Sequence, residues 1–164
     1  MASSVPASPL CDAVVRPEPP TAGNTDANDA LSKGLVVIAD TGTKGFGVFA
    51  AAELPENTWL GDYVGEVLSQ DEYLARYPNE DGSYVLGCNE DYNIDAADPA
   101  KSSYLRFLNH APPSAANAFY EIVRKRKQRH KDVKFYTARR VEAGEELTFD
   151  YGKQYWADRG MAPV

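Results

Sequence analysis

The chain has 164 residues, of which 43% are hydrophobic, so it has room for one domain with a real core and a short extension. No stretch approaches the roughly 18 consecutive apolar residues of a membrane helix, and the N-terminus lacks the pattern of a secretory signal, so we expect an intracellular protein without a membrane partner. The formal net charge is −7, but six of the 17 Lys and Arg residues lie between Arg124 and Lys131, which leaves 11 basic against 24 acidic residues elsewhere. Such an acidic surface disfavours a nucleic-acid backbone and attracts a Lys/Arg-rich polypeptide.

Residues 1–33 are rich in Ala, Ser, Pro, Asp, Asn and Thr and contain few branched or aromatic side chains. Because such a segment cannot bury enough apolar surface to fold, we expect a disordered N-terminal tail, followed by one domain over residues 34–164. The Ala/Ser-rich opening would also suit an organelle-targeting peptide, but Asp12, Glu18 and Asp26 argue against one.

From Gly34 onward, short apolar runs alternate with turn residues, which is typical of strands rather than long helices. Glycine turns around residues 35–39 and 47–50 predict a hairpin at the start of the domain. One short helix is predicted at residues 69–77, because Ser69 suits the N-cap, Glu72 is its capping-box partner and Pro78 follows the end. Further strands are expected at 59–67, 84–88, 92–95, 118–123, 133–138 and 146–149, which makes the domain mainly β.

The basic run between Arg124 and Lys131 separates two predicted strands, so its simplest interpretation is a solvated hairpin tip. It could instead contact nucleosomal DNA or act as a nuclear-import signal. The two cysteines, Cys11 and Cys88, are too few for a four-cysteine zinc site and show no metal-binding spacing, so we expect free thiols and no metal.

Two segments place glycine beside an aromatic residue. Lys44-Gly45-Phe46-Gly47 lies at a strand-to-strand turn, where the backbone can pass close to a bound molecule and the ring can lie over it. A tight hairpin with a packing Phe explains this segment equally well. Tyr63-Val64-Gly65-Glu66 is a strand end for which core packing is the simpler explanation.

Arg106-Phe107-Leu108-Asn109-His110 is harder to explain as packing, because an Asn-His pair beside large apolar residues is costly to bury without partners. A zwitterionic amino-acid ligand would supply them, since groups near Asn109 and His110 suit its ammonium and carboxylate ends and Arg106 adds a cation. A buried structural histidine is the alternative. The run 144–152, Gly-Glu-Glu-Leu-Thr-Phe-Asp-Tyr-Gly, indicates by itself only a turn, an edge strand and an exposed tyrosine.

In this order and with these intervals, the segments resemble the SET family of protein lysine methyltransferases over about residues 35–156. The resemblance includes Tyr92-Asn93-Ile94-Asp95-Ala96 and Asn117-Ala118, and it rests most on the Arg-Phe-x-Asn-His and Glu-Leu-Thr-Phe-Asp-Tyr-Gly blocks. It implies small twisted sheets, one or two short helices and a C-terminal pseudoknot of the Asn-His and Tyr segments. It also implies that S-adenosylmethionine and a peptide bind on opposite faces, joined by a narrow channel.

The resemblance also assigns residues to this site. Tyr151 corresponds to the catalytic tyrosine at the channel mouth, and the lysine channel is expected to be lined by Tyr63, Phe149, Tyr151 and Tyr155. Core packing without ligand contact remains an alternative for Trp156. Cofactor contacts are expected from Lys44, Phe46, Gly47, Tyr84, Arg106, Asn109, His110, Tyr151 and Trp156.

Phe149 stands where the family has either Phe or Tyr, and the absence of a hydroxyl favours di- or trimethylation. The chain departs from most relatives in a loop at 111–117 that is two residues longer and in Ser102-Ser103, which replaces Gly-Asn. It also has Tyr155-Trp156 in place of a cysteine-rich zinc segment, which resembles the minimal viral SET histone methyltransferases.

The acidic surface predicts a basic, lysine-containing substrate, so we expect a histone tail and a nuclear protein. A non-histone substrate and an inactive SET module that only binds a peptide are the alternatives. The intact Tyr151, Asn109 and His110 argue against inactivity. The sequence leaves the oligomeric state open.

Overall fold

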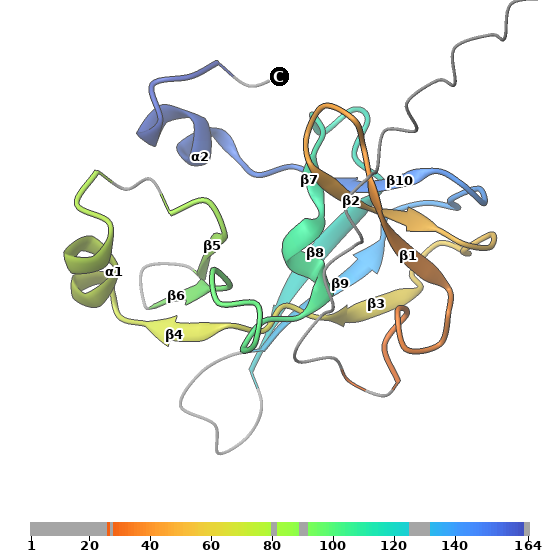
Figure 1. The fold of residues 1–164 in the computed structure, drawn as a ribbon, viewed down its shortest axis with the longest axis horizontal. Coiled ribbons are helices and arrows are strands. Elements are labelled where there is room, and N and C mark those ends of the chain that lie inside the picture. Colours follow the sequence, from red (N-terminus) through yellow and green to blue (C-terminus); the bar gives the residue numbers. More distant parts are fainter. Residues whose placement is uncertain (1–25, 27, 80–81, 89–91, 125–131, 163–164) are drawn as a thin grey trace, which may run out of the picture.

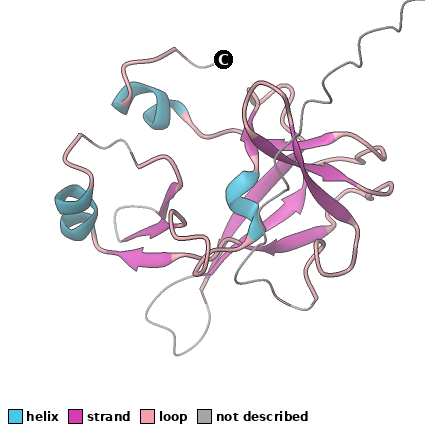
Figure 2. Cartoon of the chain, viewed as in Figure 1, coloured by secondary structure: helices cyan, strands magenta, loops and turns pink. Residues whose placement is uncertain are grey.

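The computed structural model describes residues 26, 28–79, 82–88, 92–124 and 132–162. Within these residues, strands form three small sheets accompanied by two short α-helices and a 3-10 turn (Figures 1 and 2). The mainly β prediction is therefore confirmed.

The first sheet has the strand order β1-β2-β10-β7. The predicted opening hairpin is confirmed, and it consists of β1 (Val36–Asp40) and β2 (Phe46–Ala50) in antiparallel pairing. The C-terminal strand β10 (Glu146–Phe149) pairs with β2 on one side and, in parallel, with the two-residue strand β7 (Asn109–His110) on the other.

Hydrogen bonds extend the contact between the Asn-His segment and β10. The backbone N–H of Ala111 donates to the Phe149 carbonyl, and that of Asn117 donates to the Thr148 carbonyl, both at 3.1 Å. The Asn117 side-chain oxygen accepts in return from the Thr148 N–H at 2.8 Å. The loop that follows β7 thus wraps around β10, as expected for a pseudoknot.

The other two sheets have three strands each. One has the order β3-β9-β8, from β3 (Trp59–Asp62), β9 (Asp132–Thr137) and β8 (Ala118–Val123). The other has the order β4-β6-β5, from β4 (Glu66–Leu68), β6 (Tyr92–Asp95) and β5 (Val85–Cys88). The strand β5 therefore lies at an edge of its sheet.

The prediction of one strand over residues 59–67 was wrong, because β3 and β4 belong to different sheets. The Tyr63 N–H still donates to the Val133 carbonyl at 2.8 Å, beside β9. At Gly65 the chain then passes so close to β6 that a Cβ there would lie 2.3 Å from the Asp95 carbonyl oxygen. Only glycine permits this approach. The close approach at Gly65 takes the chain from the sheet that contains β3 to the sheet that contains β4.

The predicted helix is confirmed as α1 (Gln70–Arg76), with Ser69 as N-cap and a complete capping box to Glu72. The sequence analysis did not predict α2 (Lys153–Asp158) or the 3-10 turn Tyr104–Phe107. In Figure 1, α2 lies above β5, on the same side of the molecule as α1.

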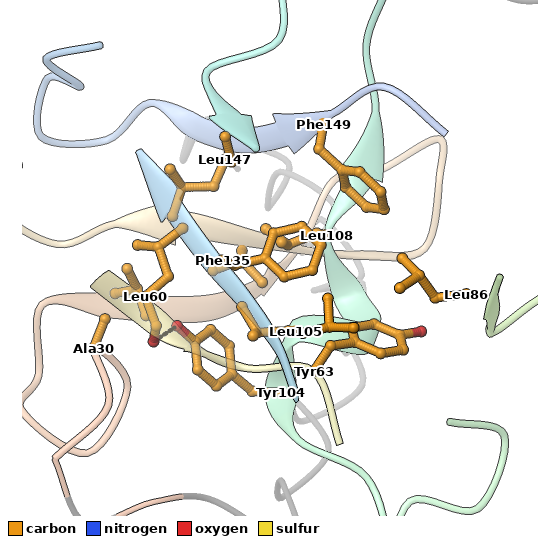
Figure 3. Packing of buried hydrophobic residues seen from close by; sticks show 14 of the residues in the cluster. Ala30, Leu60, Tyr63, Leu86, Tyr104, Leu105, Leu108, Phe135, Leu147 and Phe149 are labelled. Carbon is orange, nitrogen blue, oxygen red and sulfur yellow. Dashed lines mark hydrogen bonds between the residues drawn. The ribbon is translucent and has the colours of Figure 1, made fainter. Parts of the chain in front are cut away.

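The core gathers where the sheets meet, and Figure 3 shows Phe135 at its centre with Leu60, Leu105, Leu108, Leu147 and Phe149 around it. Ala30 belongs to this core at 1% exposure, and its N–H donates to the Leu60 carbonyl at 3.0 Å. Packed structure therefore extends upstream of the boundary expected at Gly34. The expected disorder of residues 1–25 and the basic stretch at 125–131 lie outside the described residues.

Across the described residues, no helix combines the length and the apolar character that a membrane crossing requires.

Candidate active site

Phe46, Gly47 and Asn109, three of the residues expected to contact the cofactor, meet Glu146 where β2, β7 and β10 come together. Together with Arg106 and His110, they are called the cofactor cluster below. The Asn109 side-chain nitrogen donates to the Phe46 carbonyl at 3.2 Å and to Glu146 Oε1 at 2.8 Å. Because both amide hydrogens are engaged, Asn109 can meet a ligand only as an acceptor, through Oδ1.

Glu146 orients Asn109, although the sequence analysis did not single it out. A Cβ at Gly47 would lie 2.7 Å from Glu146 Oε1 and 3.1 Å from the Asn109 side-chain nitrogen. The available signal was Gly47 itself, which indicated that something approaches the backbone there. The glycine admits this carboxylate-amide pair, and Lys44 lies exposed in the adjoining turn.

Arg106 joins the cofactor cluster to its surroundings through aromatic rings. Its guanidinium lies 4.1 Å from the Tyr84 ring centre and 5.3 Å from that of Phe107, whose ring in turn contacts Phe46 edge-on at 6.2 Å. The guanidinium also donates to the Ala97 carbonyl at 3.2 Å. Its buried Nε has no hydrogen-bond partner within the described part of the chain.

His110 links this cluster to the C-terminal segment. Its Nδ1 accepts from the Tyr151 N–H at 3.1 Å, and its ring contacts the Trp156 ring edge-on at 4.9 Å. Trp156 is buried at 8% exposure, and its indole N–H has no partner among the residues that the structure describes. Two buried donors, Arg106 Nε and Trp156 Nε1, therefore suit a ligand that brings acceptors such as a carboxylate or hydroxyls.

The residues expected to line the lysine channel meet in one cavity of about 310 Å³. Tyr63, Phe149, Tyr151 and Tyr155, the four residues that the resemblance assigns to the channel, all line it. Tyr84, which was expected at the cofactor, lines the cavity too and reaches the cofactor cluster through Arg106.

Tyr151 belongs to both groups of residues. Its ring lies 4.8 Å from that of Phe149 and 4.6 Å from that of Tyr155 on the cavity side, and 5.3 Å from that of His110 on the other. Its hydroxyl donates to the Leu108 carbonyl at 2.7 Å, which fixes the oxygen in place.

Two phenols of the cavity, those of Tyr151 and Tyr63, stay protonated near neutral pH. Burial, followed by the neighbouring Tyr155, raises the pKa of Tyr151 well above its ordinary value. Burial also raises the pKa of Tyr63, whose hydroxyl donates to the Tyr84 carbonyl at 2.9 Å. Neither group can serve as a phenolate base near neutral pH, so both act as neutral polar groups beside the aromatic rings of the cavity.

Gln154, Asp158 and Arg159 also line the cavity and were not predicted. They lie on or just after α2, a helix that the sequence analysis missed. No group of three or more His, Cys, Asp or Glu side chains is placed to hold a metal ion in the described ranges.

Comparison with known proteins agrees with this geometry. The chain matches the SET domain model over residues 45–152. It is 34% identical over 119 residues to histone-lysine N-methyltransferase MEDEA of Arabidopsis thaliana, covering 71% of this chain and 16% of that protein. It is 32% identical over 124 residues to the human histone-lysine N-methyltransferase EHMT1 and 34% identical over 122 residues to the human histone-lysine N-methyltransferase SETD2, covering 71% of this chain in both cases.

The match spans only 9% of EHMT1 and 4% of SETD2, so it concerns one domain of much longer relatives. Within the present chain, however, it covers most of the residues expected to contact the cofactor, Lys44 and Trp156 excepted, and most of the cavity lining. The chain belongs to the SET domain family.

Proposed function

We propose that the protein transfers a methyl group from S-adenosylmethionine to the ε-amine of a protein lysine. The observation that carries the proposal is the position of Tyr151, whose ring joins the cluster around Asn109 and His110 to the aromatic cavity. A group held by the cluster and a side chain inserted in the cavity would meet at this residue.

The cluster fits S-adenosylmethionine chemically. Asn109 Oδ1 suits the ammonium of its amino-acid end, while Arg106 Nε and Trp156 Nε1 are buried donors suited to carboxylate or hydroxyl oxygens. When bound, this cofactor supplies an electrophilic methyl group on a sulfonium. The residues of the chain then have to orient it and to present a neutral amine.

The cavity is suited to preparing that amine. A lysine with the ordinary pKa near 10.4 costs roughly 3.3 kcal/mol to deprotonate at about pH 8. An aromatic cavity lowers this cost, because desolvation disfavours the ammonium form. The Tyr151 hydroxyl, fixed on the Leu108 carbonyl, is a neutral positioning group, and holding amine and methyl group in line makes the displacement effectively unimolecular.

The substrate proposed is a histone tail, bound in extended form. The strand β5 supplies residues to the cavity wall and lies at the edge of its sheet in the described part of the chain, where an extended peptide can add a further strand. The acidic balance of the chain outside the basic run favours a basic polypeptide, and the three relatives described above are named histone-lysine N-methyltransferases. We also propose that the protein is nuclear and that the basic run from Arg124 to Lys131 contacts nucleosomal DNA.

The direct test is transfer of radiolabelled methyl from S-adenosylmethionine to purified core histones. We expect incorporation with the wild-type protein and at least a hundredfold lower turnover for Tyr151→Phe, the scale seen when a group acting at the reacting centre is removed. Asn109→Ala should instead weaken cofactor binding most, measured by calorimetry. Tyr136→Phe is the matched control, because it removes a hydroxyl from a ring that stacks on Phe119, outside the cavity.

Three outcomes would contradict parts of this proposal. Transfer to another protein of a cell extract but to no histone would reject the histone substrate and retain the enzyme. Peptide binding without transfer would indicate an inactive module. Loss of the folded circular dichroism spectrum in both variants would show that Tyr151 and Asn109 are structural.

A further inference from the structure

Arg159 is a cation fixed at the wall of the cavity by contacts with two parts of the chain. Its guanidinium lies 3.7 Å from the ring centre of Tyr155 and donates to the Tyr155 carbonyl at 2.9 Å. A second donation, also at 2.9 Å, reaches the carbonyl of Gly82, which lies just before β5 and lines the same cavity. These contacts hold the charge in one place between α2 and β5.

No carboxylate neutralises this charge by a close ion pair within the described residues. The nearest candidate in sequence, Asp158, also lines the cavity, but its Oδ1 accepts from the Gln154 side chain. Arg159 also acts to lower the pKa of Tyr151, but more weakly than burial, Tyr155, Tyr84 and Glu146 raise it. The position of the guanidinium at the cavity wall is therefore what brings its charge near an entering side chain.

The remaining titratable groups around the cavity are phenols that line it or charged side chains that do not line it. The phenols are Tyr63, Tyr73, Tyr84, Tyr120, Tyr151 and Tyr155, which come from several elements and carry no charge in the neutral form. Arg106 stacks on Tyr84 from the cofactor side, while Asp95 acts on Tyr63 and Glu146 on Tyr151. Among the described side chains that line the cavity, Asp158 and Arg159 are thus the two that bear a formal charge.

We propose that Arg159 promotes methyl transfer by holding a positive charge beside the lysine channel, which favours the neutral form of the substrate amine. This inference rests on the proposed function, because it requires that a lysine enters the cavity. An ammonium entering beside a fixed cation is disfavoured relative to the amine, so the proton passes to bulk water and the lone pair becomes available. Arg159 acts through charge and does not itself accept the proton.

The distances give the size of the effect. The guanidinium carbon lies no more than about 8 Å from the centre of the Tyr151 ring, since both contact Tyr155. With an effective dielectric constant of about 20, a unit charge at that distance would change a protonation equilibrium by roughly 30-fold, and screening by solvent together with the opposite charge of Asp158 reduces this to roughly three- to tenfold. The proposal therefore predicts a shift of about 0.5 to 1 in the pKa of the bound amine.

The experiment is the pH dependence of kcat for methylation of purified core histones between pH 7 and 10.5. For Arg159→Gln we expect the apparent pKa of the rising limb to increase by about 0.5 to 1, with kcat roughly three- to tenfold lower at pH 7.5 and near wild type at the highest pH. Arg159→Lys should restore most of the wild-type profile, because it retains the charge. Lys153→Gln is the matched control, since it removes an exposed cation of α2 that does not line the cavity.

Arg159→Met provides a second uncharged variant that keeps an apolar stem against Tyr155, in case Arg159→Gln disturbs folding. A measurement without any substitution is also available, because raising the salt concentration screens the charge and should move the wild-type profile toward that of Arg159→Gln. Thermal unfolding of each variant establishes that the folded state is retained.

Each contrary result overturns the inference in a recognisable way. An equal fall of kcat at every pH in Arg159→Gln and Arg159→Lys would show that Arg159 only ties α2 to Gly82. A shift of the same size in Lys153→Gln would assign the effect to net charge rather than to Arg159. Absence of transfer by the wild-type protein at any pH would reject the proposed function, and the inference with it.

Discussion

Phe149 occupies the wall of the cavity beside the residue proposed to be catalytic. Its ring contacts Phe135 edge-on at 5.0 Å and Tyr151 at 4.8 Å, and Figure 3 shows the Phe149 and Phe135 side chains directed toward one another. The ring is nearly buried, at 7% exposure, and a phenyl side chain carries no hydrogen-bonding group. The wall at this point therefore offers no hydrogen bond to the amine or to a water molecule beside it.

The absence of a hydroxyl at Phe149 predicts how many methyl groups the product lysine carries. A monomethylated amine must rotate for a second transfer, and its methyl group then needs space that an anchored water would fill. We expect the wild-type protein to proceed to di- or trimethyllysine, and Phe149→Tyr to stop mainly at monomethyllysine while the first transfer stays within about threefold of wild type. Mass spectrometry of a peptide time course with excess cofactor measures both.

The control for the added hydroxyl is Phe119→Tyr, because Phe119 lies on β8 outside the 310 Å³ cavity. Wild-type protein that accumulates only monomethyllysine would contradict the Phe149 argument. In that case the Tyr155 hydroxyl, which also lines the cavity, would be the group to remove next.

At the scale of the elements, α1 is tied to the sheet that carries β5 by one buried carboxylate. Asp95 in β6 is 3% exposed and accepts from the Arg76 guanidinium at 2.9 Å and from the Tyr77 hydroxyl at 3.0 Å. Its other oxygen accepts from the Ala97 N–H at 2.9 Å, which fixes the turn beside Arg106. The helix, the edge strand and the cofactor cluster are thus connected through Asp95.

Asp95→Asn should therefore lower stability. An amide of the same shape replaces one accepting oxygen with a donor that faces Arg76 or Tyr77, and unsatisfied buried groups cost about 1 to 3 kcal/mol. For a chain of this size the midpoint of thermal unfolding should fall by about 2 to 10 °C, measured by calorimetry. Asp98→Asn is the control, because its carboxylate is 47% exposed and pairs with Lys101 only at 3.8 Å. Equal midpoints for the two variants would show that the network does not stabilise the fold.

The elements that the sequence predicted well are those defined by local signals. The α1 capping box is complete, and the bounds of β6, β8 and β10 agree with the prediction, because strand runs and caps depend on neighbouring residues. The helix α2 was missed because its N-cap, Gly152, makes no side-chain capping bond. The strand β7 has two residues and exists only through pairing with the distant β10.

The same distinction applies to the site. Several residues quoted from separate motifs lie close together in the fold, but the partners that orient them could not be inferred locally. Glu146 was quoted only as part of a motif, and its contact with Asn109 was not predicted, while Arg159 lies outside the motifs. Arg159 reaches Gly82 across 77 positions of the chain, and the Asn109 amide meets Glu146 across 37. Family resemblance therefore predicted the chemistry, and the three-dimensional contacts show what holds Asn109 and Arg159 in place.

At the scale of the whole molecule, several acidic side chains have hydrogen-bond or ion-pair partners that favour their ionised form. The hydrogen bond from Arg139 is the largest influence on Glu145 and lowers its pKa to about 2. Arg76 similarly lowers the pKa of Glu66, and the Ser69 cap lowers that of Glu72. These groups bind a proton less readily in the folded protein than in the unfolded chain.

The sign of the pH dependence follows from that difference. A carboxylate with a lowered folded-state pKa contributes stability above its unfolded value near 4.5, and this contribution disappears as the pH falls toward about 2. We expect the free energy of unfolding to decrease over this interval. Because the Glu145 side chain is 30% exposed and that of Arg139 49%, solvent screening limits the share of Glu145 to about 1 kcal/mol.

Urea unfolding of the wild-type protein and of Glu145→Gln at pH 6, 4.5, 3 and 2 tests this expectation. The variant should be less stable by about 1 kcal/mol at pH 6, and the difference should shrink to a small fraction of that at pH 2, where a carboxylate with a pKa of about 2 is about half protonated. Glu56→Gln, at an exposed position, should show no such convergence. A difference between wild type and Glu145→Gln that stays constant down to pH 2 would mean that the variant loses packing or hydrogen bonds rather than charge. The contribution of Glu145 would then belong to its contact with the Asn117 side chain, which holds the loop around β10, and not to its ionisation.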